Sequence, residues 1–95
     1  MLEDALSHNT NHEVVFVVSP IAKPWWERFT GHNELSAIEE WLRKFPHVHV
    51  LGFTEISQGY ELSEFMDLTH LNETGARRFS KELRNRLVSL DILVP

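Results

Sequence analysis

The stretch EVVFVVSP, residues 13 to 20, contains a continuous apolar run from Val14 to Val18 that ends at Ser19 and Pro20. Its β-branched and aromatic residues follow one another without polar alternation, which predicts a β-strand buried on both faces. Such strands normally lie inside a parallel sheet, with a neighbouring strand on each side. We therefore expect an α/β fold built around this strand.

A helix and a second strand are predicted to follow. KPWWERF, residues 23–29, can form a short helical turn with Pro24 at its first position. The next helix should run from Glu34 to Phe45, with Asn33 as its N-cap and Pro46 ending it. Its predicted apolar face consists of Leu35, Ile38, Leu42 and Phe45. HVHVLGF, residues 47–53, reads as a second strand, so the order strand, helix, strand predicts a right-handed parallel βαβ unit.

The last third of the chain predicts a loop over 54–66, with a helical turn near Leu62, and then a helix over 73–90. Asn72 can cap that helix, and Gly75 in its first turn indicates a close backbone contact there. The apolar stripe of the helix consists of Ala76, Phe79, Leu83, Leu87 and Leu90. DILVP, residues 91–95, can be a frayed end or a third, edge strand. The first dozen residues can hold a helical turn around 2–6, or no regular structure.

Composition limits the possible classes of protein. Ninety-five residues with 42% hydrophobic content predict one small domain, 1–95, with a polar N-terminal segment over 1–12. The absence of Cys excludes disulfides and thiolate metal sites. No apolar run reaches the roughly 18 residues that span a membrane. The polar start is unlike a secretory signal, so we expect neither export nor a membrane partner and take the cytoplasm as the default location.

The net charge of −5 argues against nucleic acid as a partner. Cations nevertheless gather in the final helix, where residues 72–95 hold five cations and three acids. A basic helix can meet an anionic partner, but Glu73 and Glu82 interrupt the patch. This interruption favours a solvated helix face, with cations placed where the helix dipole favours them.

The number of predicted strands is too small for the predicted burial. A two-stranded sheet is marginal by itself, whereas Val14 to Val18 has the pattern of an interior strand. Either the chain is the tail of a larger domain, or it completes its sheet by self-association, or its terminal segments contribute strands. These three alternatives stay open from the sequence.

DLTHLNETGARRFSKEL, residues 67–83, resembles the closing block of the SGNH, or GDSL-type, hydrolase superfamily. In that block an Asp and a His are spaced D-x-x-H before the final helix, matched here by Asp67, His70, Leu71, Asn72 and Gly75. The two predicted strands resemble those that precede the block, so the resemblance covers most of residues 13–90. It implies a βαβα, partial three-layer sandwich of flavodoxin-like type, completed by oligomerisation or by a missing segment.

The resemblance implies His70 as a general base and Asp67 as the carboxylate that orients it, without a cofactor or metal. The reaction would be ester hydrolysis or O-acyl transfer on a small-molecule or glycan acyl ester. The chain contains no Gly-Asp-Ser block to supply the nucleophile. We therefore expect it not to be active alone. Ser19, at the end of the first strand, is the least unfavourable local substitute; Ser57 and Ser63 have only loop positions in their favour.

Two further groups of residues attract attention. His47 and His49 lie on one side of the second strand, as in some metal sites, and a third ligand would have to come from elsewhere, such as His70 or Asp67. The absence of a carboxylate at fixed spacing favours two partly exposed histidines flanking an edge strand. Trp25, Trp26 and Trp41 could line a ligand surface. Because adjacent tryptophans cannot both face one core, we expect one of the pair at 25–26 to be partly exposed, in packing or self-association.

Two functions from different classes remain. The chain is either the C-terminal part of an SGNH-type esterase or acyltransferase, or a non-enzymatic α/β protein derived from such a part. In the first case a missing segment or a partner chain supplies the serine. In the second case it acts as a homo-oligomer or a binding protein.

Overall fold

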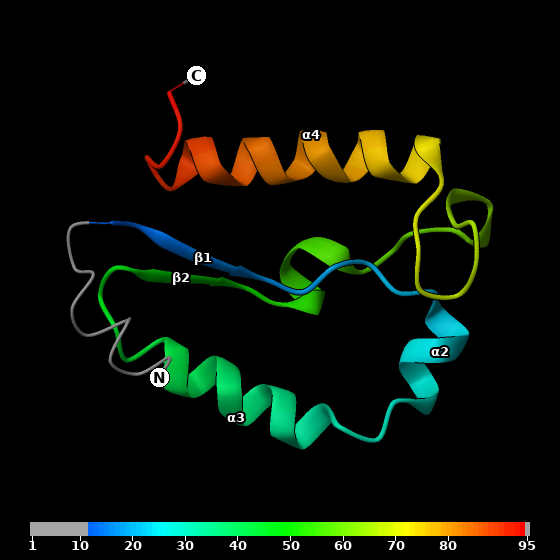
Figure 1. Ribbon diagram of the computed structural model, residues 1–95, viewed down its shortest axis with the longest axis horizontal. Coiled ribbons are helices and arrows are strands. Elements are labelled where there is room, and N and C mark those ends of the chain that lie inside the picture. Colours follow the sequence, from blue (N-terminus) through cyan, green and yellow to red (C-terminus); the bar gives the residue numbers. More distant parts are fainter. Residues whose placement is uncertain (1–11, 95) are drawn as a thin grey trace.

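The computed structural model describes residues 12–94, which form a mixed α/β domain (Figure 1). In chain order its elements are β1 (Val14–Val17), α2 (Lys23–Arg28), α3 (His32–Leu42), β2 (Val48–Leu51), the π-helical turn η1 (Phe53–Ser57), the 3₁₀ turn η2 (Leu62–Glu64) and α4 (Glu73–Ser89). The turn expected around 2–6 lies outside the described residues. No helix within 12–94 is both long enough and apolar enough to span a membrane.

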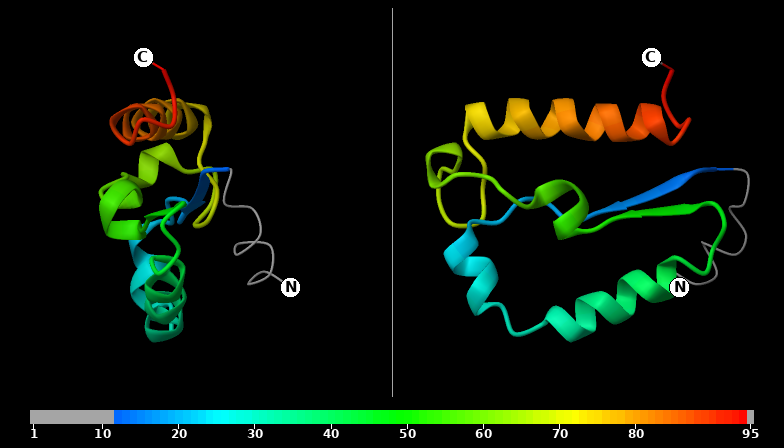
Figure 2. Two further views of the ribbon diagram at one scale, coloured as in Figure 1. Left: turned by 90° about the vertical axis from the view of Figure 1, so that its left-hand side faces the viewer. Right: turned by 180° about the vertical axis from the view of Figure 1, so that it is seen from behind.

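β1 and β2 form a two-stranded parallel sheet in which Val14 pairs with Val48 and Val17 with Leu51. The parallel strand–helix–strand unit predicted from the sequence is confirmed. Helix α3 lies on one side of the strand pair and α4 on the other (Figures 1 and 2). Both strands run towards the end of the molecule where α2 and the start of α4 lie. Loops at that end follow the carboxyl ends of the strands, where α/β proteins place their sites.

The core lies between α3 and the sheet. Leu42, Val48 and Val50 are buried there, and four half-buried side chains pack against them: Val14, Phe16, Trp41 and Phe45. Side chains alternate along a strand, so Val15 and Val17 face the α4 side. In α4 the only buried residue is Gly75, so α4 covers its side of the sheet less completely than α3 does.

β1 corrects the prediction of a strand buried on both faces. All four of its residues are only half-buried, and its only partner within 12–94 is β2. The apolar pattern shows that these side chains favour burial, but a strand becomes fully buried only when another strand lies on each side of it. β2 is the better-buried strand because α3 packs against it in addition to β1.

Helix α3 begins and ends earlier than the pattern predicted. Gly31 is its N-cap, so Asn33 does not cap it, and the C-cap is Arg43. The N–H of Phe45 is bonded to the carbonyl of Leu42 in the turn that follows, so Pro46 does not end the helix. Ile38, assigned to the apolar face, is 47% exposed. α3 covers only two strands, so part of its apolar stripe extends beyond the sheet.

The end of the chain turns back instead of adding a strand. Asp91 adopts a left-handed backbone with φ of 61°, and the N–H groups of Ile92 and Leu93 both bond to the carbonyl of Leu87. These bonds satisfy carbonyls in the last turn of α4. Residues 91–94 therefore form a helix-terminating turn, and the edge-strand alternative is wrong for them.

Candidate functional site

The Asp-His motif lies on a short loop that the backbone closes on itself. Phe65 and Leu71 form an isolated antiparallel bridge, in which the N–H of Met66 donates to the carbonyl of His70 at 2.7 Å. Two positions further out, the N–H of Asn72 donates to the carbonyl of Glu64 at 2.9 Å. Residues 66–70 therefore form a tight hairpin directly before α4.

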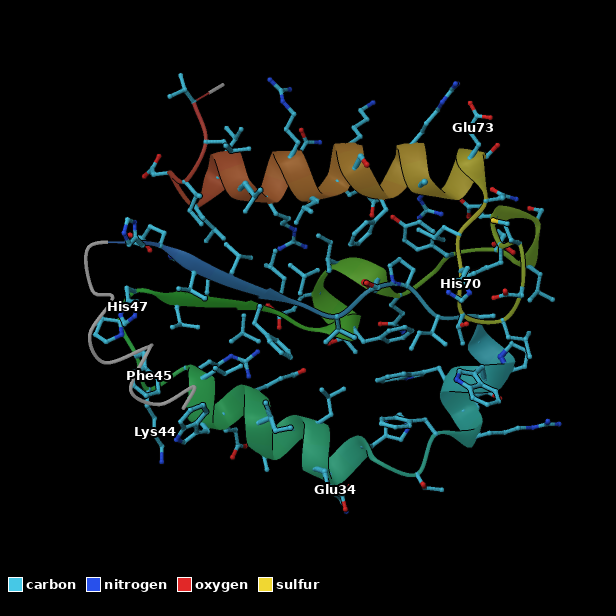
Figure 3. All side chains as sticks on the ribbon, in the orientation of Figure 1. Glu34, Lys44, Phe45, His47, His70 and Glu73 are labelled. Atoms are coloured by element: carbon cyan, nitrogen blue, oxygen red, sulfur yellow. The ribbon has the colours of Figure 1, made fainter. Side chains whose placement is uncertain are left out.

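This hairpin belongs to the carboxyl-terminal end of the sheet. The N–H of Ala22, in the segment after β1, donates to the carbonyl of Leu68 at 2.9 Å, and Ala22 is fully buried. Figure 3 shows His70 at this end of the molecule, beside the start of α2, whereas His47 lies at the opposite end. His70 thus lies at the end of the molecule that holds the carboxyl ends of the two strands.

Asp67 and His70 are in direct contact. Nδ1 of His70 lies 2.9 Å from Oδ1 and 3.0 Å from Oδ2 of Asp67. The carboxylate can only accept, so Nδ1 is the protonated nitrogen in this pair. Oδ1 also accepts the backbone N–H groups of Thr69 and His70, each at 2.9 Å, which is an Asx turn.

These hydrogen bonds stabilise the charged form of Asp67. The backbone N–H of Thr69 is the largest cause that lowers the pKa of this carboxyl below its usual value, and the hydrogen bond from the His70 side chain is the next. Asp67 therefore stays ionised in mildly acidic solution. A permanent negative charge beside an imidazole stabilises the imidazolium that forms when the ring accepts a proton.

The other nitrogen of His70 is left available. The side chain of His70 is 72% exposed, and its hydrogen bonds within residues 12–94 involve Nδ1. With Nδ1 protonated, Nε2 carries the lone pair. The ring is therefore oriented as a general base would be, but no hydroxyl group within residues 12–94 is hydrogen-bonded to Nε2.

The rest of the motif builds the support for this loop. Asn72 is the N-cap of α4: its Oδ1 accepts the N–H of Gly75 at 3.0 Å, as predicted, while its Nδ2 donates to the carbonyl of Ser63 at 2.7 Å. Gly75 is buried against Glu64, and a Cβ on Gly75 would overlap the Glu64 carbonyl oxygen. The close backbone contact predicted at Gly75 is confirmed.

A charged network that sequence reasoning missed joins α4 to the loop before the motif. Arg78 donates to Glu64 at 2.8 Å and to Glu82 at 3.1 Å, and its guanidinium lies 4.1 Å from the centre of the Tyr60 ring. Tyr60 donates to the second carboxylate oxygen of Glu82 at 2.9 Å. Burial and this bond to Glu82 raise the pKa of Tyr60. The i, i+4 spacing of Arg78 and Glu82 could have predicted their ion pair. The contacts with Tyr60 and Glu64 could not be predicted, because these residues are distant in the sequence.

None of the candidate serines is bonded to His70 in the described part of the chain. Ser57 is buried and donates to the carbonyl of Val18, so its hydroxyl has a structural role. Ser63 and Ser19 are exposed, and the backbone carbonyl of Ser63 accepts the hydrogen bond from Nδ2 of Asn72. The structure thus brings together Asp67 and His70, but no serine with them.

The two histidines of the second strand are separated in role. His47 is buried, so the expectation of partial exposure is wrong for it, and its Nε2 has no hydrogen-bond partner within the described residues. His49 instead bonds to the carboxylate of Glu13 at 2.6 Å. Across 12–94 no group of three His, Asp or Glu side chains is arranged to hold a metal ion.

The two adjacent tryptophans differ in exposure, as expected. Trp25 is 47% exposed, whereas Trp26 is half-buried and stacks on Phe53 with ring centres 3.9 Å apart. Trp41 packs against Phe45 in the core. A cleft of about 660 Å³ lies between α2 and the chain that leads into η2, and Trp26, Phe53, Tyr60, Gln58 and Lys23 are among its lining residues. Neither Asp67 nor His70 lines this cleft.

The chain matches no known family model, no curated protein and no solved structure. Its functional assignment therefore depends on the geometry of the Asp67–His70 loop and on the motif that builds it.

Proposed function

We propose that this chain is an SGNH-hydrolase-like C-terminal module whose Asp67–His70 pair serves ester hydrolysis or O-acyl transfer. The observation that carries the proposal is the contact of 2.9 Å between Nδ1 of His70 and the Asp67 carboxylate, with the other side of the ring exposed. In this role Nε2 removes the proton of a serine hydroxyl, and Asp67 stabilises the resulting imidazolium. The partial three-layer, flavodoxin-like architecture is part of the same proposal.

The remaining groups of the motif support that chemistry by fixing the loop. The Asx turn of Asp67 holds the backbone of residues 67–70, while the Asn72 cap attaches it to α4. An orienting carboxylate must keep its geometry while the imidazole charge changes. A hairpin bonded at both ends meets that requirement better than an open loop.

The nucleophile in this proposal comes from another segment or chain. Ser57 is committed to Val18, and the chain has no Gly-Asp-Ser block. Acyl transfer also needs donors for the oxyanion, which the Asp-His pair does not provide. A small-molecule or glycan acyl ester is the substrate class in this proposal, and nucleic acid and membranes are not partners in it.

The proposal is tested by ester hydrolysis in mixtures. The chain is assayed on an activated short-chain acyl ester alone, and again with a polypeptide from an adjacent reading frame that carries Gly-Asp-Ser. Hydrolysis is expected only in the mixture. His70→Ala should reduce it by a factor on the order of 10³ or more, and Asp67→Asn by roughly 10² to 10⁴.

His49→Ala is the matched control, because His49 also pairs with a carboxylate, that of Glu13. It should leave hydrolysis unchanged. Equal activity of the His70→Ala and unsubstituted mixtures would refute the proposed role of the pair. The competing function is a non-enzymatic oligomerisation or binding protein, and the observation that favours it is that the motif already has a complete structural role in closing the loop and capping α4.

A further inference from the structure

The outer edge of β1 has backbone groups that no other part of residues 12–94 pairs with. The N–H of Val14 donates to the carbonyl of His47 at 2.9 Å, and that of Val18 to the carbonyl of Leu51 at 3.0 Å. Along a parallel strand, alternate residues bond to the same neighbour, so Val15 and Val17 direct their N–H and C=O groups away from β2. No residue within 12–94 outside the strand pair bonds to these groups.

This edge lacks the features that normally protect an edge strand. Such strands are usually interrupted by charges, prolines or bulges, whereas residues 14–18 are all apolar. The outer edge of β2 differs from that of β1. The N–H of Val48 donates to the carbonyl of Phe45, and Arg86 and Leu90 of α4 line the hollow beside the strand. β1 is therefore the edge available for pairing.

The flat shape of the molecule agrees with an uncovered outer edge of β1 within residues 12–94. It measures 41 × 36 × 19 Å, so it is less than two helices thick in its shortest direction. Its radius of gyration is 14.6 Å, compared with about 12 Å expected for a rounded domain of this length. In the end-on view of Figure 2, no described element lies beyond β1 on its outer side.

We propose that a second copy of this chain covers the edge of β1, with the two β1 strands antiparallel about a twofold axis at Phe16. In this register Val15 of each copy lies opposite Val17 of the other. Each of these two pairs exchanges both backbone hydrogen bonds, which gives four bonds across the axis. The product is a continuous four-stranded sheet in the order β2-β1-β1-β2, which removes the weakness of a two-stranded sheet.

The proposed register also avoids repulsion between like charges. The same register places Glu13 of one copy opposite Ser19 of the other, so no like charges face each other at the ends of the paired strands. Glu13 is already paired with His49 at 2.6 Å. The broad side of the molecule, 41 × 36 Å, is large enough for the roughly 800 Å² per partner that stable interfaces bury.

The proposed dimer is independent of the proposed hydrolase chemistry. Antiparallel pairing sends the carboxyl ends of the two β1 strands in opposite directions. The two His70 loops then lie at opposite ends of the dimer, and neither copy supplies a nucleophile to the other.

Light scattering tests the assembly, since a monomer has a mass of 11.1 kDa and the expected species has twice that mass. Val15→Pro removes an outward N–H but no bond to β2, so this variant should become monomeric while its circular dichroism stays unchanged. Leu62→Ser, which replaces a 61% exposed apolar side chain away from the strand, should remain dimeric. A monomeric unsubstituted chain, or a dimeric Val15→Pro variant, would overturn the proposal.

Cysteine cross-linking tests the register, because the chain has no Cys of its own. Phe16→Cys should form an intermolecular disulfide on oxidation, since residues opposite each other at the axis have Cα atoms about 4.5 Å apart. Val15→Cys should not, because two copies of residue 15 are displaced along the strands by roughly 7 Å. If loss of Phe16 unfolds the chain, the double variant Val14→Cys/Val18→Cys makes the same test. Preferential cross-linking at 15, or a dimer that cross-links at neither set, would overturn the register and the proposed interface.

Discussion

Oδ1 of Asp67 accepts two hydrogen bonds from His70 itself, one from the backbone N–H and one from Nδ1 of the ring, each at 2.9 Å. A single oxygen thus fixes both the backbone position and the ring orientation of the histidine. The D-x-x-H spacing is the one that lets a carboxylate reach back along a tight turn to do this. The motif therefore has a structural role in closing the loop.

His70→Ala should raise the pKa of Asp67 towards its usual value without reaching it. The hydrogen bond from the side chain of His70 lowers this pKa, but the N–H of Thr69 is the larger cause and remains in the variant. Carbon NMR of the Asp67 carboxyl group during an acid titration measures the change. His49→Ala serves as the control and should leave this pKa unchanged.

The same titration has a consequence for stability. Because the pKa of Asp67 is lowered on folding, its contribution is present above the ordinary aspartate value and is lost as the pH falls through the lowered value. The stability difference between the unsubstituted chain and Asp67→Ala should therefore shrink below about pH 4. Urea unfolding at several pH values measures it; a difference that grows on acidification would contradict the role of the ionised carboxylate.

Gly75→Ala should destabilise the chain, although alanine is the better helix former. Propensity alone predicts a gain of up to about 1 kcal/mol. The new Cβ would instead overlap the carbonyl oxygen of Glu64, which also accepts the N–H of Asn72. We expect a net loss of roughly 1–3 kcal/mol in the free energy of unfolding. Thr74→Ala, at the exposed neighbouring position, should stay within about 0.5 kcal/mol of the unsubstituted chain.

Arg78→Met should destabilise the segment that supports the loop. It leaves Glu64, which is 9% exposed, without its cationic partner, and removes the guanidinium from the Tyr60 ring. Because the side chain of Arg78 is itself 40% exposed, we expect a loss of about 1–3 kcal/mol, below that of a fully buried pair. Denaturant unfolding measures this loss. Addition of Glu64→Gln should recover part of it, and no recovery in the double variant would show that the charge on Glu64 is not the cause.

Tyr60 should ionise only at unusually high pH. Burial first, and then its hydrogen bond to Glu82, raise the pKa of this phenol. Stability from Tyr60 is present below the ordinary tyrosine value of about 10 and is lost as the pH rises towards the raised value. Tyr60 is the only tyrosine of the chain, so tyrosinate absorbance reports on it alone. Glu82→Gln should lower the ionisation pH, whereas a midpoint in the unsubstituted chain equal to that in denaturant would contradict the hydrogen bond.

Local patterns predicted the helices and strands well because their causes are local. The apolar run before Pro20 and the Asn72 cap both follow from neighbours in the sequence. The close contact at Gly75 was predicted from its place in the first turn of the helix, but its partner, the Glu64 carbonyl, is seen only in the folded chain. The start of α3 was predicted less well. Asn33 is a good cap by type, but the chain turns into the helix two residues earlier, at Gly31.

The amino-acid sequence by itself determined the parallel strand pair, the capped final helix and the spacing that lets Asp67 reach His70. Only the tertiary structure decided that β1 is half-buried and pairs with β2 alone within residues 12–94. It also decided that His47 is buried while His49 bonds to Glu13, and that Arg78 links Tyr60, Glu64 and Glu82. The physical reason is the distance along the sequence between the residues that interact. Caps, turns and strand propensity depend on residues a few positions apart, whereas burial and ion pairs depend on segments that only the folded chain brings together.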